Sequence, residues 1–348
     1  MDSIIILIYV RRGQMAITES AYLGNIQIRN RLVRSATWEG LCDCDGRIPA
    51  ELYGIYNELA DGGVGLIVTG LIDVCPYDIG IEGNMRLISD GLIPEYRVLT
   101  DSIHRRGAKI FAQLNINRYT RQSGEKVSVN EMTEGDIALA AGYFLDGARR
   151  AYRAGFDGIQ LHLAYSWLLN RFLDPNQNHR ADLYGASTEN RCRIVLDIIS
   201  EIRKALPGFH ISAKFSFWHS GDGFDAEEGS KAVKLLSRHL DSIELLGEGC
   251  DLESDRRVDS IYLPLVSPII KDLSCPVILT GNNRDLIGME KIHREYGIEA
   301  FGLCRALIRE SDLPNKFVNG ASTRSLCRAC GGCNSTNGSR CVFNIKKS

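Results

Sequence analysis

The chain has 348 residues, of which 44% are hydrophobic and 24% charged, and its formal net charge at pH 7 is −2. This composition is that of a globular protein that can bury one large α/β core or two smaller ones. A charge so close to zero, with Lys and Arg scattered along the chain, argues against an electrostatic hold on nucleic acid or on an anionic membrane. We therefore expect a small-molecule substrate, with neither nucleic acid nor membrane as a partner, and we leave a homo-oligomer open.

The first residues contain the apolar run "IIILIYV", which is too short to span a bilayer. Basic residues follow this run instead of preceding it, the reverse of a secretory signal. We predict an N-terminal extension over residues 1–16, not necessarily native structure, with recognisable fold from Ile17. The alternatives are an upstream extension before a natural start at Met15 and a packed N-terminal strand. Without a secretory signal, the eleven cysteines are expected to be reduced, in the cytoplasm.

Short apolar runs alternate with amphipathic helical patterns along most of the chain. Eight runs have the nearly continuous apolar character of strands covered on both faces, and they span 31–36, 65–70, 109–115, 158–163, 210–216, 242–249, 276–281 and 300–305. Helical patterns between them include 49–63, 95–107, 136–155 and 187–206. This order favours an α/β fold with one (β/α)8 TIM barrel over 17–321, followed by a cysteine-bearing tail over 322–348. A doubly wound sheet is the alternative, but the Gly-rich turn that it predicts after its first strand is missing.

A barrel of this kind places its chemistry at the C-terminal ends of its strands. Those ends offer an amide at Gln113, an imidazole at His162, a cation at Lys214, a glycine at Gly281 and an arginine at Arg305. Glycine and arginine on the last two strands suit a phosphate, because backbone N–H groups can approach where there is no side chain. A buried lysine needs an anionic partner, and a flavin ring, negatively charged when reduced, provides one.

Several segments in order resemble the old yellow enzyme family, the FMN-dependent NADH:flavin oxidoreductases. They include "NRLVRSATWEG", "DGGVGLIVTG", "CRALIRESDLPNK" and, most specifically, the stretch from "HLAYSW" at 162 to "ENRCR" ending at 193. The resemblance covers roughly Ile17 to Lys316. It implies a (β/α)8 barrel that holds FMN noncovalently and is reduced by NAD(P)H. Hydride would then pass from flavin N5 to an α,β-unsaturated carbonyl or a related electrophile.

The same resemblance assigns roles by position. The expected FMN contacts are Ala36, Thr37, Gly70, Gln113, Lys214, Gly281, Asn282 and Arg305. Gln113 would bind the pyrimidine, Lys214 would lie near N1 and O2, and the last three would bind the phosphate. His162 would donate to the substrate carbonyl oxygen and so stabilise the developing enolate.

The motif after His162 departs from the family pattern, which usually continues Ala-(His or Asn)-Gly-Tyr. This chain has Tyr165, Ser166 and Trp167 at the last three places. An indole N–H is not a usable acid, so the usual proton donor is missing. Tyr165 could act as catalytic carbonyl donor or proton source, water could supply the proton, or ene reduction could be lost. We expect Trp38 and Trp167 to give a bulkier, more aromatic substrate pocket.

Two other uses of the same flavin stay open at this point. One is a dehydrogenase- or demethylase-type reaction, in which hydride runs into N5. The other is a flavin-binding redox partner or sensor without ene-reductase turnover.

Four cysteines close the chain with ligand-like spacing: Cys327, Cys330, Cys333 and Cys341. Multidomain relatives of the dienoyl-CoA reductase type carry an iron–sulfur cluster at a comparable place. An iron–sulfur cluster, a structural zinc and four reduced thiols all remain open.

Overall fold

The computed structural model describes residues 15–78, 80–217, 226–247 and 258–344. Eight strands pair in parallel in the order β3-β11-β10-β9-β8-β7-β6-β4, and a further β3–β4 pairing closes the ring. Their bounds are β3 Leu32–Arg34, β4 Leu66–Asp73, β6 Lys109–Asn115, β7 Gly158–Leu163, β8 His210–Phe217, β9 Ser242–Gly247, β10 Val277–Thr280 and β11 Ala300–Leu303. The predicted (β/α)8 barrel is therefore confirmed, and all eight predicted strands have a counterpart.

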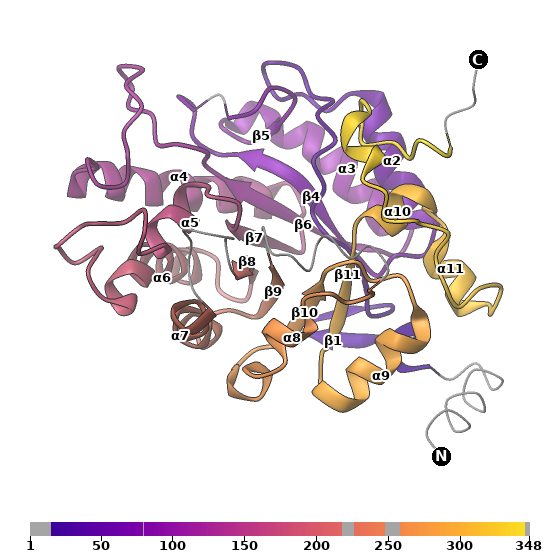
Figure 1. The fold of residues 1–348 in the computed structure, drawn as a ribbon. Coiled ribbons are helices and arrows are strands. Elements are labelled where there is room, and N and C mark those ends of the chain that lie inside the picture. The colour runs from indigo at the N-terminus through magenta and orange to yellow at the C-terminus, as the bar shows by residue number, and fades with distance from the viewer. Residues whose placement is uncertain (1–14, 79, 218–225, 248–257, 345–348) are drawn as a thin grey trace.

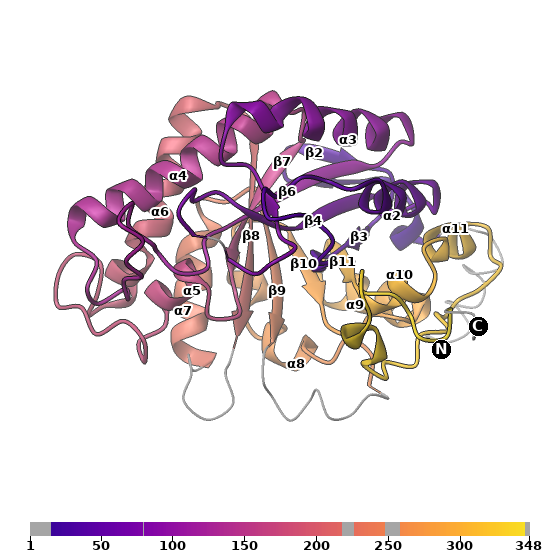
Figure 2. The same cartoon turned by 90° about the horizontal axis from the view of Figure 1, so that it is seen from above.

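Helices surround the barrel on the outside (Figures 1 and 2). They are α2 Ala50–Asp61, α3 Ile93–Arg105, α4 Glu134–Arg153, α5 Leu168–Leu173, α6 Thr188–Ala205, α7 Ala226–Ser237, α8 Leu263–Val266, α9 Leu286–Tyr296, α10 Arg305–Arg309 and α11 Leu313–Val318. Local sequence sets their starts: at α4, Thr133 and Asp136 form a capping box that satisfies two backbone N–H groups. Among the described helices, none is long and apolar enough to cross a bilayer.

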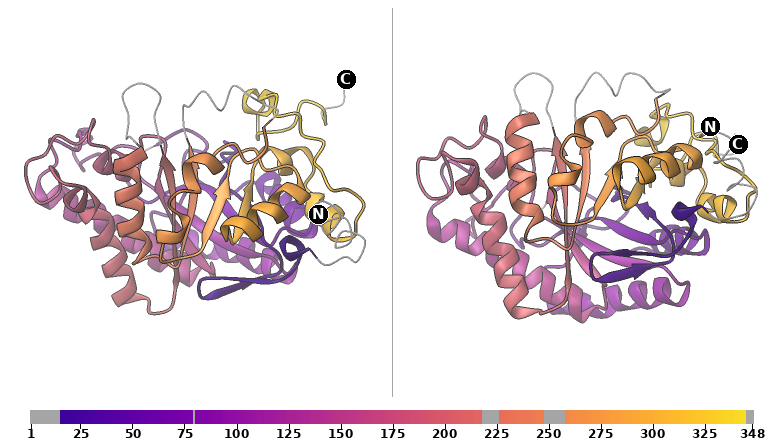
Figure 3. Two further views of the ribbon diagram at one scale, coloured as in Figure 1. Left: turned by 60° about the horizontal axis from the view of Figure 1, so that its bottom comes forward. Right: turned by 90° about the horizontal axis from the view of Figure 1, so that it is seen from below.

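A short antiparallel hairpin precedes the barrel and was not predicted. Its strands are β1 Ala21–Leu23 and β2 Ile26–Ile28. Leu23 and Ile28 pack with the barrel-interior residue Phe111, and Figure 3 shows the hairpin, in indigo, against the barrel strands. The sequence did carry a signal, since Gly24-Asn25 is a common two-residue hairpin turn and lies between the short segments "AYL" and "IQI".

Strand β4 is longer than predicted and contains an irregularity. Its pairing with β6 shifts register between Val68 and Leu71, and the short strand β5, Met85–Arg86, pairs with its far end. A bulge adds a residue to one strand and bends it, and bulges often lie beside active sites. Here the bulge contains Thr69 and Gly70, at the end of the barrel where the site was predicted.

Both ends of the described chain pack on the barrel. Met15 is buried in the core, whereas residues 1–14 of the predicted extension lie outside the described residues. The tail lies beside α2 and α10 (Figure 1, yellow), where Ser325 Oγ donates to Glu310 at 2.9 Å and Ser339 Oγ donates to the backbone oxygen of Trp38 at 2.7 Å. The boundaries at 17 and 322 stay predictions.

Candidate active site

The C-terminal ends of the strands surround a cavity of about 250 Å³, which we call the aromatic cavity. It is lined by Ala36, Thr37, Trp38, Leu71, Ile81, Gln113, His162, Tyr165, Trp167 and Lys214. Eight of these ten residues were predicted from the sequence. Leu71 and Ile81 were not, because nothing in their local sequence separates them from ordinary core residues.

Lys214 and Glu244 form a buried ion pair at this end of the barrel. The two residues are register partners on β8 and β9, and Lys214 Nζ lies 3.4 Å from Glu244 Oε1. Lys214 is 4% exposed and Glu244 is 0% exposed. The prediction that buried Lys214 needs an anionic partner is met within the protein itself, and a flavin would be a further partner.

The Glu244 carboxylate accepts hydrogen bonds from three more side chains. Ser35 Oγ donates at 2.5 Å, Thr280 Oγ1 at 2.9 Å and Gln160 Nε2 at 2.9 Å. Gln160 Oε1 in turn accepts from Gln113 Nε2 at 2.7 Å. Glu244 is thus connected to the two polar residues predicted to face the flavin pyrimidine, Lys214 directly and Gln113 through Gln160.

His162 leaves β7 into the aromatic cavity as a neutral imidazole. Burial lowers its pKa well below the ordinary value, and the positive charge of Lys214 lowers that pKa further. Within the described chain, its buried Nδ1 has no hydrogen-bond partner. The rings of Tyr165 and Trp167 lie beside it, with centroids 5.9 Å and 6.0 Å away. A buried polar atom without a partner is costly, so this nitrogen is available to a ligand.

The backbone after β7 makes an unusual turn. Tyr165 and Ser166 have φ angles of 60° and 54°, in the left-handed region that side chains other than glycine rarely adopt. Asn170 helps to hold it, since its Oδ1 accepts from the Ser166 N–H at 3.1 Å. Such conformations cost free energy and concentrate at functional sites. This turn places Tyr165 where it lines two cavities at once.

The second cavity has a volume of about 370 Å³, and we call it the glycine cavity. Its lining includes Tyr165 and all three predicted phosphate residues, Gly281, Asn282 and Arg305. Gly281 has a φ of 149°, and a side chain on it would overlap the Tyr262 ring. The backbone there can lie against the Tyr262 ring only because residue 281 is glycine.

Gly70 lines neither cavity. Its N–H donates to the Tyr56 hydroxyl at 2.9 Å, and a Cβ at this position would lie 2.8 Å from the Thr37 backbone oxygen. Gly70 therefore lies behind the segment that lines the aromatic cavity and lets that segment approach β4.

The four tail cysteines border a third, small cavity of about 20 Å³, together with Arg305 and Phe343. Burial raises the pKa of Cys327 and of Cys333. In the described part of the chain, no three His, Cys, Asp or Glu side chains are arranged to hold a metal ion. The cysteines therefore gather at one place without forming a ligand set.

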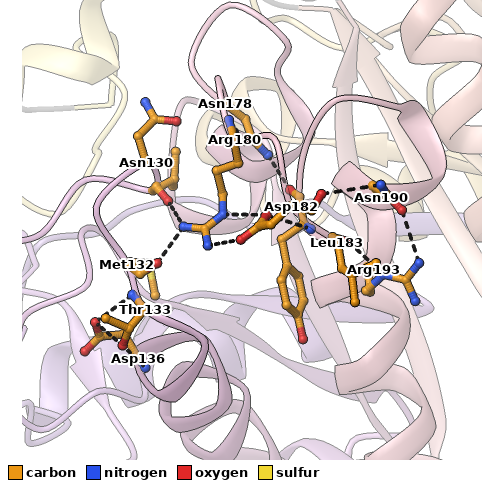
Figure 4. A network of polar contacts seen from close by, with 12 residues as sticks. Asn130, Met132, Thr133, Asp136, Asn178, Arg180, Asp182, Leu183, Asn190 and Arg193 are labelled. Atoms are coloured by element: carbon orange, nitrogen blue, oxygen red, sulfur yellow. Dashed lines mark hydrogen bonds and ion pairs between the residues drawn. The ribbon is translucent and has the colours of Figure 1, made fainter.

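The loop after α5 is held by a polar network around Arg180 (Figure 4). Arg180 donates to the backbone oxygens of Val129 at 2.8 Å and Met132 at 2.6 Å, and its Nε donates to Asp182 at 3.0 Å. Asn178 Nδ2 closes the loop by donating to the Tyr184 backbone oxygen at 2.7 Å. These residues connect two loops and lie in neither cavity, so their role is structural.

The sequence prediction missed Glu244 and Gln160. One signal was present: Glu244 is a single carboxylate in the apolar run "SIELL", and buried charges occur in pairs. Its partner could not be chosen without knowing which strands are neighbours and in which register.

Residues 20–323 match the model of the NADH:flavin oxidoreductase / NADH oxidase family. An NADH oxidase of Thermoanaerobacter brockii is 31% identical over 90% of this chain and 52% of its own length. An NADPH dehydrogenase of Geobacillus sp. is 34% identical over 83% of this chain and 89% of its own length. A 4,4'-dithiodibutanoate disulfide reductase of Rhodococcus erythropolis is 27% identical over 94% of both chains. The chain thus spans about half the length of some relatives and most of others.

Solved structures share the fold. A 2-naphthoyl-CoA reductase complex matches with a TM-score of 0.81 at 22% identity. The match covers 91% of this chain and 54% of the reductase chain. Morphinone reductase has a TM-score of 0.72 at 19% identity, over 89% and 91%. The predicted family is confirmed. The chain belongs to the NADH:flavin oxidoreductase family, the old yellow enzyme-like NAD(P)H-dependent flavin oxidoreductases.

Proposed function

We propose that this protein binds FMN across the aromatic and glycine cavities and uses NAD(P)H to reduce an activated alkene, or a related electrophile, held against His162. The observation that carries the proposal is that Tyr165 lines both cavities, so that the two adjoin. One holds the amide of Gln113 and the ammonium of Lys214, and the other holds Gly281 and Arg305. A ring with a polar edge, joined to a phosphate, matches this pair of cavities.

The residues present fit FMN. The aromatic cavity combines apolar walls with polar groups on β6 and β8, as an isoalloxazine requires. The glycine cavity exposes backbone at Gly281 and a cation at Arg305, as a phosphate requires. Relatives named NADH oxidase and NADPH dehydrogenase support a nicotinamide as the electron donor.

When bound, FMN would take a hydride from NAD(P)H and deliver it to the electrophile. The neutral imidazole of His162 would donate a hydrogen bond to the substrate carbonyl oxygen and stabilise the negative charge that develops there. A low pKa is compatible with this role, because the neutral ring keeps one N–H that can donate. Trp38 and Ile81, which are 45% and 40% exposed, would form the apolar entrance for the substrate.

Reduction of an alkene needs a proton in addition to the hydride. Residue 167 is tryptophan and cannot supply that proton, so another source is required. We propose Tyr165, whose ring lies beside His162 and whose phenol can transfer a proton. The family relatives have varied acceptors in their names, among them a disulfide reductase and a cinnamate reductase, so the acceptor itself must be found by assay.

One anaerobic experiment tests the proposal. The FMN-loaded protein is mixed with NADH or NADPH, bleaching of the flavin absorbance is followed, and cyclohexenone or a dienoyl thioester is then added. We expect bleaching and then reoxidation by the alkene. Bleaching with no reoxidation by any electrophile would instead indicate a redox partner or sensor, and reduction by an amine substrate would indicate a dehydrogenase. A protein that cannot take up FMN would refute all three functions.

A metal centre, one of the possibilities that the cysteine spacing left open, stays a proposal for the tail. It is supported by the gathering of Cys327, Cys330, Cys333 and Cys341 around one small cavity. Their present arrangement does not fit an ion, so no step of the reaction is assigned to it. Iron, zinc and acid-labile sulfide analysis of anaerobically purified protein distinguishes a cluster, a zinc site and free thiols.

A further inference from the structure

The polar network beneath the aromatic cavity converges on one carboxylate. Glu244 is completely buried, and four side chains donate to it or lie against it: Ser35, Gln160, Thr280 and Lys214. A carboxylate so deep in a barrel is costly unless it is paired and hydrogen-bonded, as this one is. Glu244 does not line the aromatic cavity, so it would act on a ligand there only through other residues.

We propose that Glu244 is a positioning residue, which fixes the orientation of the Gln113 amide and offsets the charge of Lys214. By offsetting that charge, it favours oxidised over reduced FMN. The proposal rests on the FMN site of the proposed function. It adds a determinant of the cofactor's redox balance that neither the sequence motif nor the cavity lining includes.

The orientation of the Gln113 amide follows from donor and acceptor chemistry. A carboxylate only accepts hydrogen bonds, so the Gln160 group facing Glu244 must be its NH2. The Gln160 oxygen then faces Gln113, and Gln113 must present its own NH2 to it, at 2.7 Å. The remaining N–H and the Oε1 of Gln113 are thus left for groups in the cavity that Gln113 lines. An amide at position 244 could either donate or accept and would no longer impose this order.

Lys214 carries the positive charge that Glu244 offsets. Its Nζ lies 3.4 Å from Glu244 Oε1 and donates to Ser35 Oγ at 3.0 Å, and all three side chains are buried. Burial by itself raises the pKa of Glu244, but the charge of Lys214 and hydrogen bonds from Ser35, Gln160 and Thr280 together hold that pKa below its ordinary value. The pair is therefore ionic and nearly neutral in sum. A neutral pair stabilises the negative charge of a reduced flavin less than a lone ammonium would.

The test compares FMN-loaded wild type with Glu244→Gln. Removing the negative charge should favour reduced FMN relative to oxidised FMN by about tenfold or more, a rise in midpoint potential of about 30 mV for a two-electron couple. The potential is measured by anaerobic titration against a reference dye. In a Lys214→Met background the same substitution should change the ratio by less than about threefold, because without the lysine charge burial would leave the Glu244 carboxyl already neutral.

Glu290→Gln is the matched control. Glu290 is equally buried but lies in α9, where it accepts from the Ile17 N–H at 3.1 Å and from Arg294. It should lower the melting temperature and leave the redox ratio unchanged. If Glu244→Gln does not fold, Gln160→Leu tests the amide relay, and it should weaken oxidised FMN binding to the apoprotein by about tenfold.

The two proposals fail in different ways. Wild-type apoprotein that takes up no FMN refutes the proposed function. The role of Glu244 alone is refuted if the wild type binds FMN, Glu244→Gln leaves the midpoint potential unchanged and Gln160→Leu leaves the FMN affinity unchanged.

Discussion

The phenol ring of Tyr165 lies edge-on to the imidazole of His162, with centroids 5.9 Å apart and an interplanar angle of 62°. His162 lies in β7 and Tyr165 follows the end of that strand, and the left-handed turn at Tyr165 and Ser166 brings the phenol ring back beside the imidazole. A potential proton donor is therefore held beside the group proposed to bind the substrate oxygen, in a chain whose residue 167 cannot donate a proton.

Removing the Tyr165 hydroxyl tests this arrangement. We expect Tyr165→Phe to bind FMN as wild type does, because the ring is kept, and to slow flavin reoxidation by an alkene by about 100-fold, a typical contribution of general acid catalysis. Stopped-flow measurement of the reoxidation step gives the rate. An unchanged rate would mean that water supplies the proton.

Replacing Trp167 with tyrosine should act in the opposite direction. Trp167→Tyr places a phenol beside His162, where the indole centroid now lies 6.0 Å from the imidazole. We expect alkene reduction to accelerate by about tenfold, because a phenol is an acid and an indole is not. Trp167→Phe has a similar ring without the hydroxyl, and the same acceleration in that variant would show that the gain comes from space in the pocket.

His162→Ala should separate substrate binding from flavin binding. His162 lines the aromatic cavity, but the predicted contacts to the flavin pyrimidine come from Gln113 and Lys214. FMN affinity should therefore change by less than about threefold, while the charge-transfer absorbance with a bound phenol is lost, since the phenolate loses its hydrogen-bond donor. Loss of FMN in this variant would show that His162 has been assigned to the wrong part of the site.

A side chain at Gly281 should impair FMN binding. Gly281→Ala would overlap the Tyr262 ring next to the proposed phosphate site, and we expect the affinity for FMN to fall by at least about tenfold. Gly297→Ala is the control, because Gly297 also has a positive φ, 73°, but has open space around it. Both variants are measured by flavin fluorescence quenching and thermal unfolding. Equal losses of affinity would point to general backbone strain.

We expect His210 to make the free energy of unfolding depend on pH. It is fully buried at the start of β8, contacts Asn25 Oδ1 at 2.6 Å and Ser242 Oγ at 2.9 Å, and burial lowers its pKa to about 4. The unfolded chain, with the ordinary histidine pKa of about 6.5, therefore binds the proton more readily than the folded chain does. This contribution to stability is complete above pH 6.5 and is lost as the pH falls towards 4.

The expected size of that loss is about 3 kcal/mol between pH 6.5 and pH 4. Urea unfolding of wild type and His210→Gln at several pH values isolates it, since other titrating groups are common to both proteins. The difference in unfolding free energy should shrink as the pH falls. A constant difference would show that His210 is not held neutral by burial.

The amino-acid sequence was enough to predict the barrel, because the period of its apolar runs and the helices between them are local properties that need no knowledge of neighbours. It also indicated His162, Gln113 and Lys214, since polar side chains at the C-terminal ends of buried barrel strands lie where such barrels bind their ligands. The hairpin at Gly24-Asn25 was readable in the same way and was missed.

The pairing of Lys214 with Glu244, and the connection of Gln113 to the same carboxylate, became visible only in the folded chain. These contacts depend on which strands are adjacent and on a register that a shift of one residue would destroy. The structure likewise showed that Tyr165 lines both cavities, because the turn that carries it there uses backbone angles that neither tyrosine nor serine favours by itself. Local patterns specify strands and helices, whereas the partners of a buried charge are set by the packing of the whole barrel.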